Sequence, residues 1–296
     1  MSFESCEDGF GHVLHGDGAT ITTVFDNHDV ESLIAHHGVL VLRGFSDGAA
    51  GFEEVTDRLG RVRPANIRSG TTREFSSTRG TQAVNAGQQA LPLHAESYYT
   101  PICPQILSFA CVSHTADGGA TTVCDGVALF RALSPAARRA LLECDVVWRH
   151  SCPAEELEAQ TQRPLSEFVA WCGNADRCEV TVDDSTRRIR IDYRAPAIRR
   201  TRWSNLEAFA NNLIPLDRAG LLEEMAPGLS PDVVREAQAV AEELIVPHKW
   251  LPDDVLLIDN TRVMHGRTGW STGNRRILAR MLTVDAAPDA RFSALC

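Results

Sequence analysis

The spacing of apolar and polar positions predicts a chain built mainly of β-strands. Apolar or alternating runs of strand length occur over residues 38–45, 106–113, 121–124, 188–193, 255–259 and 276–284. Helix signals predict helices over 47–59, from Asp125 to Leu142, from a capping box at 204–207 and over 230–244. Because strands and helices do not alternate regularly, a doubly wound parallel sheet is disfavoured. The pattern predicts a jelly-roll barrel with flanking α-helices.

Two segments lack a decodable motif. Between residues 61 and 90 the pattern dissolves into Gly, Ser, Thr, Asn and Arg, and so long an irregular stretch is typical of a functional loop. We expect residues 61–90 and 151–202 to form the lid or substrate segments of a single domain spanning residues 1–296. No internal repeat or linker divides the chain.

Composition narrows the possible classes of protein. Apolar residues make up 44% and charged residues 23%, which excludes collagen-like, coiled-coil and disordered chains. The net charge of −10 disfavours nucleic acid and anionic membranes as partners. No apolar run approaches the ~20 residues of a membrane span, and the acidic start lacks a signal peptide, so we expect a cytoplasmic protein. The nine cysteines include no Cys-x-x-Cys pair, so reduced thiols are expected.

A metal site is the strongest chemical signal. His94 and Glu96 are two residues apart, and positions i and i+2 of a strand point to the same side. A distant His265 would complete a face of two histidines and one carboxylate, which suits non-haem iron(II) with dioxygen. The same three side chains would also satisfy a catalytic zinc ion, so a zinc hydrolase stays open on these residues alone.

Two further residues indicate a dicarboxylate cosubstrate. Arg276 stands eleven residues after His265 within a predicted strand, and a guanidinium group can hold a carboxylate through two parallel hydrogen bonds. Thr121 follows the Gly118-Gly119-Ala120 turn and offers a hydroxyl to the same carboxylate. A zinc hydrolase leaves both residues without a purpose.

Taken in order, these motifs resemble the taurine dioxygenase-like (TauD/TfdA) family of iron(II)- and 2-oxoglutarate-dependent oxygenases. The matching segments are residues 38–45, 94–96, 118–121, 259–260, 265–267 and 275–280, within about residues 38–285. The resemblance implies a double-stranded β-helix, that is, a clavaminate synthase-like jelly roll. It also implies roles for seven residues: iron ligands His94, Glu96 and His265, 2-oxoglutarate contacts Thr121 and Arg276, and substrate contacts Tyr99 and Arg280.

Glu96 departs from the commonest family pattern, which has aspartate there. Glutamate resembles members that oxidise free amino acids or aminoacyl groups on carrier proteins, and any carboxylate argues against halogenation. We therefore expect an enzyme that uses Fe(II), 2-oxoglutarate and O2 to hydroxylate an unactivated C–H bond in specialised metabolism. Its substrate would be small and amino-acid-derived, either free or bound to a carrier protein.

Several alternatives stay open at this point. The chain could be a zinc-dependent hydrolase or a non-catalytic jelly-roll binding protein. Arg280 has a structural ion pair as an equal alternative to its substrate role. The cluster of Arg199, Arg200 and Arg202 is read equally as a solvated patch or as part of a substrate lid.

Overall fold

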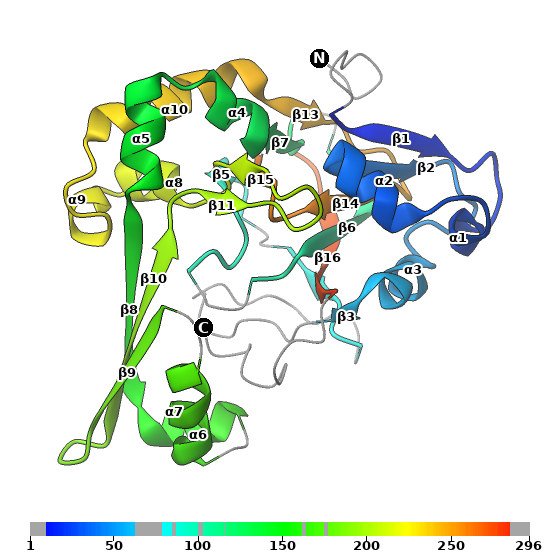
Figure 1. Cartoon of the computed structure of the whole chain (residues 1–296). Helices are drawn as coiled ribbons and strands as arrows, with labels where there is room; N and C mark the ends of the chain where they lie inside the picture. The colour runs from blue at the N-terminus through cyan, green and yellow to red at the C-terminus, as the bar shows by residue number, and fades with distance from the viewer. Residues whose placement is uncertain are drawn as a thin grey trace.

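The strands form two main β-sheets (Figure 1). The computed structural model describes residues 10–62, 79–84, 87–99, 103–115, 117–161, 164–174 and 177–284. The larger sheet has the order β1-β2-β14-β6-β16-β3, with β4 also paired to β16; its strands are β1 (His12–His15), β2 (Val39–Arg43), β3 (Arg61–Val62), β4 (Gln82–Ala83), β6 (Ile106–Ser113), β14 (Val255–Asp259) and β16 (Arg276–Thr283). The smaller sheet has the order β13-β7-β15-β5, with strands β5 (Leu91–His94), β7 (Thr121–Asp125), β13 (Val246–His248) and β15 (Val263–Arg267). The described strands do not close into the barrel that the sequence pattern had predicted.

The two sheets share one apolar core. Val39 and Val41 of β2 pack with Val123 of β7 and Val263 of β15 in this core. Because side chains alternate along a strand, the intervening Leu40 and its neighbours point to the opposite face. β2 is therefore buried on both sides, which explains its unbroken apolar sequence.

Helices cover the outer face of each sheet. The larger sheet packs against four short helices near the N-terminus: η2 (Ile21–Thr23), α1 (Val24–Asn27), α2 (Val30–His37) and α3 (Phe52–Leu59). The smaller sheet packs against α4 (Gly126–Ala132), α5 (Pro135–Leu142), α8 (Leu213–Arg218), α9 (Leu222–Met225) and α10 (Pro231–Leu244). The predicted single helix from Asp125 to Leu142 is thus divided, because Ser134 caps a new helix by accepting a hydrogen bond from Ala137 N. The helix predicted over 47–59 begins only at Phe52.

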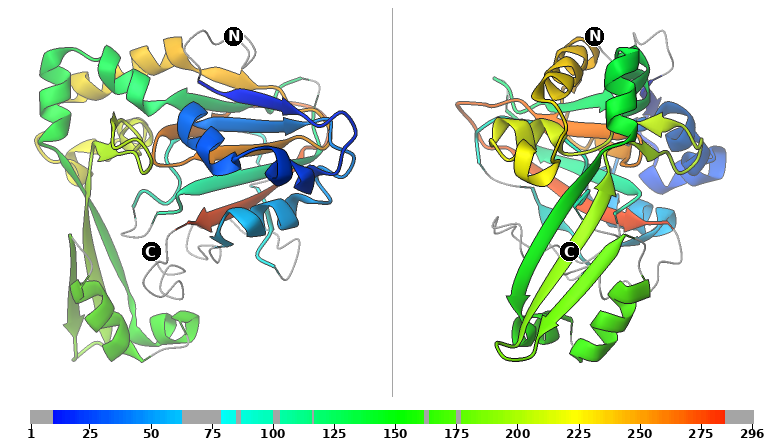
Figure 2. Two further views of the ribbon diagram at one scale, coloured as in Figure 1. Left: turned by 45° about the vertical axis from the view of Figure 1, so that its right-hand side comes forward. Right: turned by 60° about the vertical axis from the view of Figure 1, so that its left-hand side comes forward.

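An arm extends away from the two sheets (Figure 2). Its three-stranded sheet has the order β8 (Asp145–Pro153), β10 (Arg188–Pro196) and β9 (Cys178–Asp183), and it carries α6 (Ala154–Thr161) and α7 (Leu165–Asn174). Phe168 packs there with Cys152, Ile189 and Ile191 in a core of its own. Most of the motif-free segment 151–202 is therefore ordered structure.

The capping box at 204–207 does not open a helix. β11 (Arg199–Arg200) and β12 (Glu207–Ala208) form a hairpin instead. Thr201 N donates to Leu206 O at 2.8 Å, and Asn205 takes a φ of 51°. Pairing across the hairpin satisfies the backbone groups that a first helical turn would have used, so this prediction was wrong.

None of the helices in the described part of the chain has the length and apolar character needed to span a bilayer.

Candidate active site

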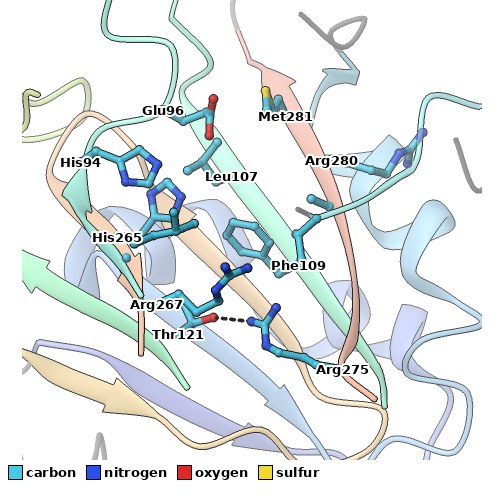
Figure 3. A pocket seen from close by; sticks show the side chains of 14 residues that line it. His94, Glu96, Leu107, Phe109, Thr121, His265, Arg267, Arg275, Arg280 and Met281 are labelled. Carbon is cyan, nitrogen blue, oxygen red and sulfur yellow. Dashed lines mark hydrogen bonds between the residues drawn. The ribbon is translucent and has the colours of Figure 1, made fainter. Parts of the chain in front are cut away.

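Two histidines and a glutamate meet where β5 and β15 pair (Figure 3). His94 ends β5 and lies opposite His265 of β15 in the antiparallel register. Glu96 follows in the turn after β5 and not within the strand, as the i, i+2 argument had assumed. One ligand atom from each residue lies within 4.8 Å of the other two. The structure therefore brings together the three metal ligands predicted from the sequence.

Neighbouring backbone and side-chain groups orient this triad. His94 Nδ1 lies 2.9 Å from Pro92 O; because a carbonyl oxygen only accepts, Nδ1 carries the proton and Nε2 is left to bind a metal. The Asn260 amide holds Glu96 by accepting from its N–H at 2.9 Å and donating to its carbonyl at 3.0 Å. Asn260 belongs to the matched pair 259–260, so this motif positions the glutamate backbone.

The turn after the triad is anchored to the base of the arm. The Tyr98 hydroxyl donates to Pro196 O at 2.6 Å, and burial raises the pKa of this phenol well above its usual value. The Arg199 guanidinium lies 4.2 Å from the Tyr98 ring centroid and donates to Tyr98 O at 2.9 Å. Arg199 is therefore an interior structural residue, whereas Arg202 of the same basic cluster is exposed.

A cavity of about 80 Å³ leads from the triad to two arginines (Figure 3). Its far end holds Thr121, Arg267 and Arg275. Arg275 donates to Gly119 O at 2.8 Å and approaches Thr121 Oγ1 at 3.5 Å. Burial, together with the charge of the neighbouring Arg267, lowers the pKa of Arg275 to about 10. Two cationic groups at one buried end make that end suited to an anion.

The family model described as "Taurine catabolism dioxygenase TauD, TfdA family" matches residues 4–282. The chain belongs to this family. It is an iron(II)- and 2-oxoglutarate-dependent dioxygenase, which confirms the class and the cofactors Fe(II), 2-oxoglutarate and O2 expected from the motifs.

Individual relatives are distant in sequence but similar in fold. The dapdiamide synthesis protein DdaC of Enterobacter agglomerans is 22% identical over 288 residues, covering 84% of this chain and 83% of DdaC. The crystal structure of PvcB from Pseudomonas aeruginosa matches with a TM-score of 0.58 and 16% identity, covering 95% of this chain and 88% of PvcB. The structure of AAD-2 with Mn(II) and N-oxalylglycine matches with a TM-score of 0.56 and 15% identity, covering 94% of both chains. These likenesses confirm the jelly-roll fold of the family.

Arg276, the family-matched candidate for 2-oxoglutarate, does not point into the cavity. Its side chain is exposed, whereas Arg275 lines the cavity. Arg275 immediately precedes β16, two residues before Ile277, which packs in the core shared by the two sheets. The pairing of β16 with β6 is also irregular between Arg276 and Ile277. The structure therefore places Arg275, and not Arg276, beside Thr121 in the cavity.

Arg280 contributes to the cavity wall, but its guanidinium group is turned away from the triad (Figure 3). It donates to Glu53 O of α3 at 2.8 Å and to Arg79 O at 2.7 Å, and it forms a 2.8 Å ion pair with Asp57. The side chain is 1% exposed. The structure thus shows the ion pair that was the alternative to the expected substrate contact of Arg280.

Tyr99 lies in the turn just after Glu96. Its ring centroid is 5.5 Å from that of Trp148 and 6.3 Å from that of His150, both on β8. An aromatic wall thus connects the triad turn with the arm. The contact between Tyr99 and the substrate therefore stays a proposal.

Much of the expected lid at 61–90 lies outside the described residues, namely 63–78 and 85–86. Within the described part, Val84 lines the cavity. Arg267 donates to Gln89 O at 2.8 Å and also bonds Gly87 O. The end of this segment therefore packs against the basic end of the cavity.

Sequence reasoning missed three residues of the basic end. Arg267 stands in the matched segment 265–267. Arg275 lies just before β16, where the pairing with β6 is irregular, so strand alternation alone does not mark it. Trp250 donates from Nε1 to Thr121 Oγ1 at 3.1 Å. No signal in the sequence marks Trp250, because its contact depends on how β13 pairs with β7.

Proposed function

We propose that His94, Glu96 and His265 hold Fe(II), while Arg275 and Thr121 bind the far carboxylate of 2-oxoglutarate. The enzyme then hydroxylates a C–H bond of a small, amino-acid-derived molecule. The observation that carries this proposal is one cavity with three metal-binding atoms within 4.8 Å of one another at one end and the partly buried Arg275 guanidinium at the other. A dicarboxylate can bridge these two ends.

The residues of the triad fit the metal. Two imidazoles and one carboxylate on one face leave coordination positions open, which suits iron(II) enzymes that use dioxygen. When bound, the iron couples the decarboxylation of 2-oxoglutarate to oxidation of the substrate. The protein's own task is to hold both molecules in the cavity and to keep water out of it.

Hydrogen bonding at the far end favours a carboxylate specifically. Thr121 Oγ1 accepts from Trp250 Nε1 at 3.1 Å and from Arg275 Nη2 at 3.5 Å. Because a hydroxyl oxygen has two lone pairs and one proton, its O–H is left to donate. An ionised carboxylate only accepts, so it matches this hydroxyl and the Arg275 guanidinium together. With a pKa of about 10, Arg275 remains cationic at neutral pH.

Two alternative functions leave some residues of the cavity without a role. A zinc hydrolase would need the triad but has no role for Thr121, Trp250 and Arg275. A non-catalytic binding protein has no need of three converging metal ligands. Anaerobic addition of Fe(II) and 2-oxoglutarate separates these readings, because only the proposed enzyme should develop a weak visible charge-transfer band. The zinc and binding readings predict no band and no succinate after oxygen is admitted.

The substrate class rests on the relatives and on the aromatic wall. DdaC is named for dapdiamide synthesis, and one PvcB structure is described as an oxygenase from an isonitrile synthetic pathway. These names support a role in specialised metabolism. Tyr99, Trp148 and His150 supply the surface on which a substrate would pack, and they connect the turn that holds Glu96 to the arm. We propose one catalytic domain in which part of segment 151–202 contributes to substrate binding.

A substrate screen tests this assignment directly. Free amino acids and the same aminoacyl groups on carrier proteins are offered with Fe(II) and 2-oxoglutarate, and succinate is measured. Substrate-dependent succinate with one amino-acid-derived compound is the expected result. Stimulation only by compounds without an amino-acid part would contradict the substrate class while leaving the cosubstrate site intact.

A further inference from the structure

A second cavity lies outside the metal site and is lined by residues of α4, α5 and the β11–β12 hairpin. Its volume is about 330 Å³, and it is lined by Phe130, Arg131, Arg138, Arg200, Asn205, Leu206 and Glu207. None of these residues belongs to the triad or to the arginine end of the first cavity. Three of the seven side chains are guanidinium groups.

The charges in this second cavity do not balance. Arg200 pairs with Glu207 at 3.4 Å and donates to Asn205 O at 2.9 Å. Within the described part of the chain, neither Arg131 nor Arg138 forms an ion pair. The cavity thus gathers two uncompensated positive charges in a chain of net charge −10. Like charges gathered in one hollow repel each other, so an anion bound between them would be stabilised.

Local structure keeps these two arginines apart from the nearby acid on α10. Arg131 is in the last turn of α4, and Arg138 is on α5. The carboxylate of Glu236 reaches the loop between these helices, but it accepts from Ser134 N at 2.6 Å and from Ser134 Oγ at 3.1 Å. The Glu236 carboxylate therefore binds the start of α5 instead of the two arginines.

We propose that this second cavity binds the phosphate ester group of a ligand. Guanidinium groups match the oxygens of phosphate through paired charge-assisted hydrogen bonds. Phe130 and Leu206 add an apolar wall beside the arginines, which suits an ester carrying an organic group better than inorganic phosphate. The phosphate ester can belong to the phosphopantetheine arm of a carrier protein or to a free nucleotide.

The β11–β12 hairpin connects this second cavity to the turn that follows Glu96. Successive residues of a strand point to opposite sides. Arg200 of β11 faces the second cavity, while Arg199 reaches inward to Tyr98 O. A ligand held by Arg200 would therefore order the same strand that supports the turn after Glu96.

Binding is tested on the whole chain by isothermal titration calorimetry at an ionic strength fixed with sodium chloride. The first probe is phenyl phosphate, which carries both a phosphate ester and an apolar group. We expect saturable binding that Arg131→Gln and Arg138→Gln each weaken by about fivefold, the upper range for exposed ion pairs. Arg139→Gln changes a neighbouring exposed arginine outside the cavity and should leave binding unchanged. No saturable binding, or equal weakening by Arg139→Gln, overturns the proposal.

A gain in affinity excludes misfolding as the explanation. Glu207→Gln removes the one carboxylate of the cavity, so phenyl phosphate should bind about twofold more tightly; weaker or unchanged binding contradicts the proposal. The inference does not rest on the proposed oxygenase site, and Arg275→Leu should retain phenyl phosphate binding. Loss of binding in Arg275→Leu would assign the phosphate to the first cavity and overturn the second site.

The source of the phosphate ester is tested by comparing 4′-phosphopantetheine with AMP as probes. Tighter binding of 4′-phosphopantetheine assigns the cavity to a carrier-bound arm, and tighter binding of AMP assigns it to a nucleotide. Equal affinities support recognition of the phosphate ester alone. Failure of both compounds to bind overturns the proposal.

Discussion

The two ends of the first cavity are assembled in different ways. At the metal end, His94 and His265 face each other across one strand pair, and Glu96 follows in the next turn. At the carboxylate end, Thr121 comes from β7, whereas Trp250 and Arg275 come from loops outside the strands. The metal end depends on one antiparallel register, while the carboxylate end depends on several separate elements meeting.

This difference predicts different responses to substitution. A metal ligand cannot be replaced by its neighbours, because each supplies one of three bonds. At the carboxylate end, a guanidinium, a hydroxyl and an indole N–H together form the binding site for 2-oxoglutarate. Removing one of these groups should therefore weaken 2-oxoglutarate binding without abolishing it.

The largest effect is expected from the triad. His94→Ala, Glu96→Ala and His265→Ala should each reduce substrate-dependent succinate formation by about 100-fold or more, since changing a residue that only orients a metal ligand already costs about 10–100-fold. The thermal unfolding midpoint without metal should change little. His15→Ala, which removes an exposed histidine, is the control. Near-normal turnover in any triad variant, with trace metals controlled, would remove that residue from the site.

A matched pair of arginine variants tests which of two adjacent residues, Arg275 or Arg276, contacts 2-oxoglutarate. Arg275→Leu should raise the KM for 2-oxoglutarate by at least about tenfold, because breaking a buried charge pair costs about 2–5 kcal/mol. Arg276→Leu should leave this KM nearly unchanged, since its side chain is exposed. Steady-state kinetics with varied 2-oxoglutarate measures both. The reverse ranking would return the role to Arg276.

Smaller effects are expected from the hydroxyl and the indole at the carboxylate end. Thr121→Val should weaken 2-oxoglutarate binding by about 0.5–3 kcal/mol. Trp250→Phe removes the N–H donor that directs this hydroxyl together with part of the buried ring, so a KM increase of about threefold with unchanged kcat is expected. Trp203→Phe is the control, because it removes an indole hydrogen bond at the surface, from Nε1 to Glu31. A fall in kcat without a change in KM would contradict a positioning role for Trp250.

The same contrast explains what the sequence could predict. The metal end was predictable because its ligands lie in short linear motifs and their pairing follows from two strands. Arg275 was not, because the inward face of β16 is decided at its first residue, beside an irregular pairing with β6. Arg280 is on the outward face, where α3 supplies its partners. Which of these arginines faces the cavity depends on the elements that pack against β16. The spacing of residues along the strand does not specify it.

The helix predicted at 204–207 shows the same limit at a smaller scale. A capping box is a local signal, but Phe209 N donates to Gly126 O at 2.9 Å and Thr201 N to Leu206 O at 2.8 Å. Tertiary pairing therefore decided the conformation. The fold class was predicted correctly despite such local errors, because it depends on many strands at once.

The last comparison is between two buried aspartates, one supporting each end of the cavity. Burial opposes ionisation of Asp254, yet hydrogen bonds from Arg43 and His248 lower its pKa below the usual value. Asp254 lies behind the carboxylate end, since His248 packs edge-on against Trp250 with ring centroids 4.4 Å apart. At the metal end, burial raises the pKa of Asp259 to about 6 despite hydrogen bonds from Thr261.

The two aspartates should act on stability with opposite signs. A lowered pKa stabilises the folded state above the unfolded value of 3.8 and is lost as pH falls through the folded pKa, so Asp254 favours neutral pH. A raised pKa means that the folded state binds more protons, so Asp259 costs stability as pH rises from about 4 to 6, by about 3 kcal/mol at most. Urea unfolding of Asp259→Asn and the unchanged protein across pH 4–7 measures this. The variant should lose that negative slope, and an identical pH profile in both proteins would show that Asp259 ionises normally in the folded state.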